Sequence, residues 1–176
     1  MSCPDFSESD KTRLLDYAKR TDLRHQELGM VLGGTPENPV LGETCIGEEC
    51  KIDIPVGGWG TYHTHPRSGP LLGCQDSLST IWRGHTHACF GGIEDKEPKI
   101  RCWALDPLGA PEAVRELRDF YDERKASGRK NGHWRKKQFE LACHLRNQYF
   151  RQVCEIGKER KPGPKQTSLM RRKRRR

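Results

Sequence analysis

Short apolar runs that alternate with amphipathic stretches restrict the fold of this chain more than any other feature. The predicted strands cover residues 27–34, a short apolar run closed by glycines, and residues 58–65, 88–93 and 99–105. The amphipathic stretches carry helix-start signals and cover 9–20, 74–84 and the segment from Pro111 to Gly128. This order predicts an α/β fold in a single domain.

Two further elements complete the predicted order. Residues 40–55 are predicted to form a hairpin that turns at 47–49. Residues 133–156 are predicted to form one long helix, because apolar residues recur there at helical spacing. The resulting packing stripe consists of Leu141, Leu145, Tyr149 and Val153.

The formal net charge of +8 is distributed unevenly along the chain. Residues 1–123 contain 13 Lys and Arg against 21 Asp and Glu, a balance of −8, whereas residues 124–176 contain 19 against 3, a balance of +16. We therefore expect a core over 1–127, a basic amphipathic helix packed on it over 128–157 and a disordered basic tail over 158–176. The tail either contacts nucleic acid nonspecifically, stays solvated or folds back on the acidic body.

The composition is typical of an intracellular protein. No apolar run approaches the roughly 20 residues that cross a bilayer, and the first residues lack a secretory pattern, so we expect a cytoplasmic location and no membrane partner. The eight cysteines include no CxxC pair, and most are expected to be buried thiols. Cys45 and Cys50 are the exception, because the predicted hairpin would bring them face to face, and a disulfide between them is an open alternative.

The segment GTYHTHPRSGPLLGCQDS, residues 60–77, contains the candidate ligands of a metal site. Residues i and i+2 of a strand point to one face, so His63 and His65 can direct their imidazoles at the same ion. Asp76 falls in the first turn of the next predicted helix, where the helix dipole favours a carboxylate. Two imidazoles and one carboxylate, with a fourth position left open, are the composition of a catalytic zinc site.

Glu27 is the candidate general base. It begins the apolar run ELGMVLGG, where an ionisable side chain is costly to bury without a partner. Water activated by zinc would be such a partner, because its proton must pass to a base and then to the leaving group.

These residues together resemble the JAMM motif of the JAB/MPN metalloprotease family, in which a glutamate precedes His-x-His-Pro and then Ser-x-x-Asp. The matching residues are Glu27, His63-Thr64-His65-Pro66 and Asp76, which lies eleven positions after the second histidine. The resemblance covers about residues 9–127 and implies a curved mixed β-sheet flanked by helices, a JAB/MPN-like and cytidine-deaminase-like fold. It also implies a Zn²⁺ cofactor held by His63, His65 and Asp76, with Glu27 as the base.

The function that the resemblance implies is hydrolysis of an amide or isopeptide bond in a protein substrate, such as the bond between a ubiquitin-like modifier and a lysine. The alternative is a weakly active or inactive JAB/MPN-type interaction module that the basic tail recruits to nucleic acid. A base and three ligands are unnecessary in a scaffold, which favours the enzyme.

The sequence departs from the family pattern at Gly73, where the family usually has a serine that helps to stabilise the tetrahedral intermediate. Losing one such donor typically lowers the rate by about 10²–10³. Ser68, Cys74 and Ser77 are open substitutes for the missing hydroxyl. Introducing Gly73→Ser is expected to leave activity unchanged or raise it, provided that the backbone there does not need a positive φ.

His85 and His87 repeat the His-x-His spacing and are a possible secondary ligand pair, with Cys89 nearby. Their flanks do not match those of His63 and His65, and a loop position without any ligand role is the competing interpretation.

Overall fold

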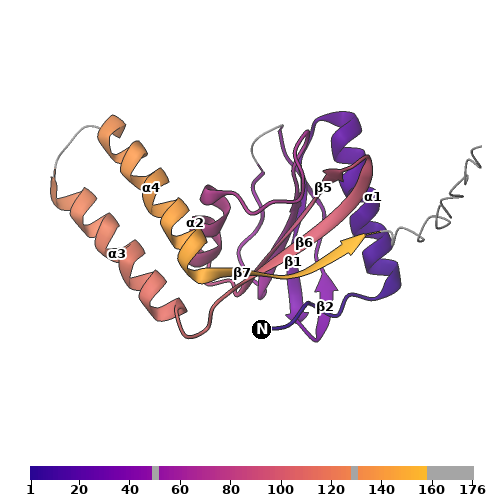
Figure 1. Cartoon of the computed structure of the whole chain (residues 1–176), viewed down its shortest axis with the longest axis horizontal. Coiled ribbons are helices and arrows are strands. Elements are labelled where there is room, and N and C mark those ends of the chain that lie inside the picture. Colours follow the sequence, from indigo (N-terminus) through magenta and orange to yellow (C-terminus); the bar gives the residue numbers. More distant parts are fainter. Residues whose placement is uncertain (49–51, 128–130, 158–176) are drawn as a thin grey trace, which may run out of the picture.

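Seven strands form one sheet in the computed structural model, which describes residues 1–48, 52–127 and 131–157. The strands are β1 (Leu28–Thr35), β2 (Asn38–Leu41), β3 (Cys45–Ile46), β4 (Gly60–Thr64), β5 (His87–Glu94), β6 (Glu97–Leu105) and β7 (Phe150–Gly157). Their order is β2-β1-β4-β5-β6-β7, and β3 pairs with β1. Only β4 and β5 run parallel, so the sheet is mixed, and it is curved (Figure 1). The α/β class is therefore confirmed.

Helices cover both faces of this sheet (Figure 1). They are α1 (Glu8–Arg24), α2 (Cys74–Trp82), α3 (Ala110–Ser127) and α4 (Asn131–Tyr149). One apolar cluster joins α1 to one face, and a second joins α2, α3 and α4 to the other. As expected for its sequence, α1 starts at a side-chain cap, because the Ser7 hydroxyl accepts a hydrogen bond of 3.1 Å from the Asp10 amide.

Alternation along β4 decides which side chains reach the α2 side of the sheet. Tyr62 faces α1, where its hydroxyl donates to the Leu14 carbonyl at 2.7 Å. His63 faces the opposite way and packs edge-on against Phe90, with ring centroids 4.6 Å apart. The sequence rule that places His63 and His65 on one face is thus met by the fold.

The predicted hairpin over residues 40–55 is wrong. β2 pairs with β1 across the turn at Pro36 and Glu37, β3 pairs with the first residues of β1, and residues 52–55 form no strand. The free edge of β1 offers hydrogen-bonding groups to both short strands, so this segment pairs with β1 rather than with itself. This pairing also holds the backbone of Glu27 in place, because the Gly47 amide donates to the Glu27 carbonyl at 2.8 Å.

The predicted helix over residues 133–156 is correct only to Tyr149. Residues 150–157 form β7, which pairs antiparallel with β6 along most of its length. Phe150, Val153 and Ile156 suit a strand, and the edge of β6 supplies hydrogen-bond partners that an isolated helix cannot reach. Residues 131–157 therefore contribute a helix and a strand to the body of the fold, and the predicted tail over 158–176 lies outside the described residues.

The expectation of buried thiols is also wrong. Cys3 is bonded to Cys154, Cys74 to Cys143 and Cys89 to Cys102, at sequence separations of 151, 69 and 13. Sequence spacing could not reveal these pairs, because the fold alone brings their Cα atoms within 5.2 Å or less. Cys45 is a free cysteine, and its predicted partner Cys50 lies outside the described residues.

Disulfides persist mainly in oxidising surroundings, with hyperthermophiles as an exception. The cytoplasmic location consequently stays a prediction, and the three pairs count against it. In the part of the chain that the structure describes, every helix is too short or too polar to span a membrane.

Candidate metal centre

His63, His65 and Asp76 converge at the edge of the sheet beside the first turn of α2. The two imidazole Nε2 atoms lie 3.0 Å apart. Asp76 Oδ1 is 3.4 Å from His63 Nε2, and Asp76 Oδ2 is 3.7 Å from His65 Nε2. The structure thus groups the three predicted metal ligands with one another.

Their spacing fits a bound metal ion. Ligands about 2.0–2.1 Å from a tetrahedral ion are separated by about 3.3 Å, close to the three separations observed. Without an ion, the contact between the two Nε2 atoms is a hydrogen bond that one tautomer donates and the other accepts. A cation satisfies both rings and the carboxylate at once, so the His-His-Asp group could hold a metal ion.

Protonation states favour ligation near neutral pH. Burial, assisted by the charge of His63, lowers the pKa of His65 to about 4, so this ring is neutral. Burial alone would raise the pKa of Asp76, but a hydrogen bond from His63 and the charges of both histidines outweigh it and lower that pKa. The group therefore presents a neutral His65 ring and an anionic Asp76 carboxylate, and metal binding would replace the proton of the His63–Asp76 hydrogen bond.

Several contacts fix the position of Asp76. Its Oδ2 accepts a 3.0 Å hydrogen bond from the Gly73 amide at the N-cap of α2. The Cys74–Cys143 disulfide ties the first residue of α2 to α4, and the Ser77 hydroxyl donates to the Ala142 carbonyl at 3.0 Å. The ligand-bearing turn is thereby held against α4.

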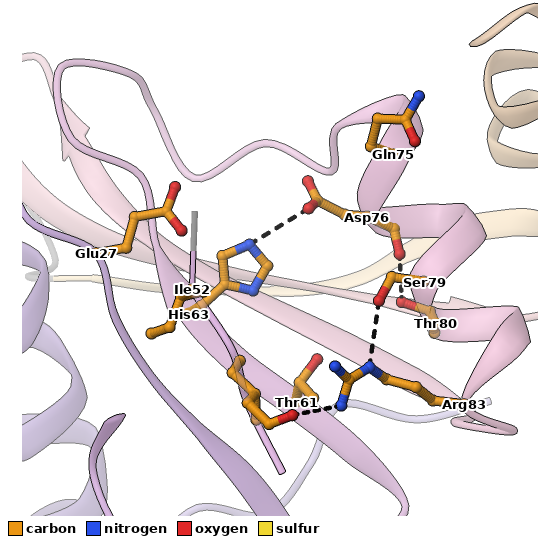
Figure 2. Close-up of a pocket in the computed structure, with 10 residues that line it drawn as sticks. Glu27, Ile52, Thr61, His63, Gln75, Asp76, Ser79, Thr80 and Arg83 are labelled. Carbon is orange, nitrogen blue, oxygen red and sulfur yellow. Dashed lines mark hydrogen bonds and ion pairs between the residues drawn. The ribbon is translucent and has the colours of Figure 1, made fainter. Parts of the chain in front are cut away.

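Glu27 lies directly before β1 and lines the same pocket as His63 and Asp76 (Figure 2). Only 8% of the residue is exposed. Burial raises the pKa of Glu27 to about 7; the charge of His63 opposes this increase, and the smaller effect of the Asp76 charge adds to it. A carboxylate poised near neutral pH beside a ligand group has the properties of a general acid–base residue.

His85 and His87 are not part of this centre. His85 is 1% exposed, and its Nε2 lies 2.9 Å from the Gly57 carbonyl oxygen. His87 begins β5, and its Nδ1 lies 2.9 Å from the Thr86 hydroxyl. The only metal-compatible cluster within the described ranges is the triad, so the structure does not group these two histidines with other ligands.

Comparison with known proteins leaves the family open. No protein-family model matches the chain, and a search of curated proteins found no match. The residues themselves must carry any functional argument.

The structure excludes two of the three residues considered as substitutes for the serine that the JAMM pattern has at position 73. Cys74 is in a disulfide, and Ser77 is fully buried with its hydroxyl donating to the carbonyls of Cys74 and Ala142. Both are therefore excluded, and Ser68 is not among the residues that line the pocket. Two lining residues, Gln75 and Arg83, escaped the sequence analysis because neither belongs to a recognisable motif.

We expect His65→Ala to abolish metal binding while the protein stays folded. The change removes one of three ligands but leaves the packing of β4 intact, since His65 follows the strand. Zinc content after dialysis, measured by atomic spectroscopy, should fall from about one ion per chain to near zero. His144→Ala, at an exposed histidine outside the site, should keep the ion, and equal zinc retention in both variants would contradict the ligand assignment.

The geometry at Gly73 reverses the expectation for Gly73→Ser. Its φ of −73° suits any residue, so the positive-φ proviso does not apply. A Cβ at this position would, however, lie 2.6 Å from Asp76 Oδ2 and push the ligand aside. We expect Gly73→Ser to weaken zinc affinity by about 10–100-fold, the usual effect of disturbing a residue that orients a ligand. Competition with a chromogenic chelator measures the zinc affinity of the variant and of the wild type.

The matched control is Gly132→Ala, where an added Cβ meets nothing within 4 Å. This variant should bind zinc like the wild type. Unchanged affinity in Gly73→Ser would show that the Asp76 carboxylate rotates freely and would restore the original expectation.

Proposed function

We propose that this protein is a zinc-dependent metallopeptidase or isopeptidase that hydrolyses an amide bond. The observation that carries the proposal is the convergence of His63, His65 and Asp76, two of which line one pocket with Glu27, whose pKa of about 7 suits proton transfer. Two imidazoles, one carboxylate and room for an exogenous ligand favour zinc over magnesium or calcium, which prefer all-oxygen sites.

A zinc ion held there would act as a Lewis acid toward both water and the scissile carbonyl. Glu27 accepts a proton from the attacking water molecule and returns it to the departing amine nitrogen. His63 and His65 would coordinate the ion, and Asp76 would coordinate it and balance part of its positive charge. The Gly73 amide keeps the Asp76 carboxylate oriented throughout.

The order of these residues in the fold supports a JAB/MPN-type enzyme with a JAMM motif. The base precedes β1, the paired histidines end β4, and the aspartate opens α2. A ubiquitin-like conjugate is the substrate class that this resemblance suggests, and a basic tail over 158–176 that contacts nucleic acid belongs to the same proposal.

The second candidate is an interaction module with weak or no activity. Gly73 favours it, because the hydroxyl expected at the N-cap of α2 is missing and neither Cys74 nor Ser77 can replace it.

Metal analysis combined with cleavage assays tests the two candidates. We expect purified protein to contain about one zinc ion per chain and to cleave members of a panel of modifier–lysine conjugates and peptides. A chelator should stop cleavage, and added zinc should restore it. Zinc-loaded protein that cleaves nothing in the panel would overturn the enzyme and leave the interaction module.

A further inference from the structure

The pocket extends well beyond the candidate ligands. It has a volume of about 330 Å³ and runs from Glu27, His63 and Asp76 to a second end formed by Thr61 and Arg83. Figure 2 shows Arg83 reaching from the end of α2 back toward Thr61. The proposed chemistry uses only the first end.

Among the described residues, the hydrogen-bond partners of Arg83 are all neutral. Its Nη1 donates to the carbonyls of Ile54 and Pro55 at 2.6 and 3.1 Å, and its Nε donates to the Ser79 hydroxyl at 3.3 Å. Throughout residues 1–48, 52–127 and 131–157, Arg83 forms no ion pair with a carboxylate, and no hydrogen bond involves its Nη2. A half-buried guanidinium with a donor to spare favours an anion, above all a planar carboxylate.

We propose that Arg83 binds the free carboxylate of the substrate's leaving residue, which makes it a specificity-determining residue. This inference rests on the proposed hydrolysis of an amide bond and names its substrate class. The favoured substrate is a chain whose last amino acid, with a free α-carboxylate, is removed. A lysine in the middle of a protein lacks a carboxylate at this distance from an isopeptide bond, so within the proposed amide hydrolysis this inference favours a chain end over the ubiquitin-like conjugate.

The dimensions of the pocket support a one-residue leaving group. The Arg83 Nε lies 3.3 Å from the Ser79 hydroxyl, and Ser79 follows Asp76 by three residues, a rise of about 4.5 Å between the two backbones along the helix axis. Thr61 lies two residues from His63, about 6.6 Å along β4. One amino-acid residue spans about 3.5 Å, and a charged hydrogen bond adds about 2.8 Å, which together match this range.

The reaction balances without a further reactant. One water molecule adds across the amide: its oxygen bonds to the acyl carbon, the carbon–nitrogen bond breaks, and the nitrogen receives a proton through Glu27. The products are a shortened chain with a new carboxylate and a free amino acid whose own carboxylate stays on Arg83 until release.

Ligand binding tests Arg83 independently of catalysis. The probes are N-acetylglycylglycine and its C-terminal amide, titrated into full-length Glu27→Gln protein, with zinc and with chelator, and followed by NMR. We expect the acid to bind about 10–100-fold more tightly than the amide in both conditions. Arg83→Gln should remove this preference, Arg83→Lys should keep part of it, and Arg20→Gln on the far side of the sheet should change nothing.

Equal affinity for acid and amide would overturn the inference. So would an Arg83→Gln variant that weakens both probes by one factor, because that is the effect of merely holding the Ile54–Pro55 segment. If Arg83→Gln does not fold, Arg83→Lys takes its place: a reduced preference for the acid supports the inference, and an undiminished preference overturns it. Failure of the proposed function is separate: it appears as absence of zinc or cleavage while the acid preference persists.

Discussion

Replacing Glu27 with glutamine is expected to lower the rate of amide cleavage by about 10²–10⁴ while the protein keeps its fold and its zinc. Glutamine has nearly the same shape but cannot accept the proton that the buried carboxylate accepts. Glu27 is not among the three clustered ligands, so its loss leaves metal binding intact. Steady-state kinetics should show the effect in kcat, with little change in KM.

The control is Glu43→Gln, an exposed carboxylate outside the pocket, which should retain full activity. His65→Ala gives the complementary result, because it loses metal and activity together. Equal zinc-dependent cleavage by wild type and Glu27→Gln would show that another group is the base. Loss of zinc in Glu27→Gln would instead place Glu27 among the ligands.

Removing the Cys3–Cys154 disulfide is expected to lower the free energy of unfolding by about 2–5 kcal/mol. The bond joins residues with a sequence separation of 151. Because a disulfide that closes a longer loop restricts the unfolded chain more, its stabilisation should lie at the upper end of this range. It also fastens the N-terminal segment to β7 at the edge of the sheet. Urea denaturation of Cys154→Ser against wild type, under non-reducing conditions, measures the loss.

Cys45→Ser is the matched control, because Cys45 is the free cysteine of the described residues and its removal breaks no bond. This variant should unfold within about 0.5 kcal/mol of wild type. Reductant should destabilise the wild type and shrink the difference between it and Cys154→Ser. Mass spectrometry that finds Cys3 and Cys154 alkylated without reduction would refute the pairing itself.

Local patterns in the sequence were sufficient to select the three candidate ligands that the structure brings together and the glutamate near them. The two-residue period of a strand places His63 and His65 on one face, and a turn-rich loop delivers Asp76 to a helix start. Glu27 stood out because a charged residue opened an apolar run. Each of these inferences depends on neighbours within a few residues, and such relations survive in any fold that keeps the element.

Other properties depended on which distant segments meet. The stretch from Phe150 to Gly157 continues a helical stripe in sequence, yet it forms β7 because the edge of β6 was available to pair with it. The six bonded cysteines looked like isolated thiols until folding brought them together.

Nothing in the sequence indicated the second end of the pocket either. Arg83 carries no motif, and it becomes a candidate anion site only because it meets the loop at Ile54 and lines one pocket with Thr61 of β4. The sequence by itself therefore determined the identity of the candidate ligands and base. Tertiary structure decided how the chain is cross-linked, where its last strand pairs and what shape of substrate the site can accept, because these depend on contacts between residues far apart in the chain.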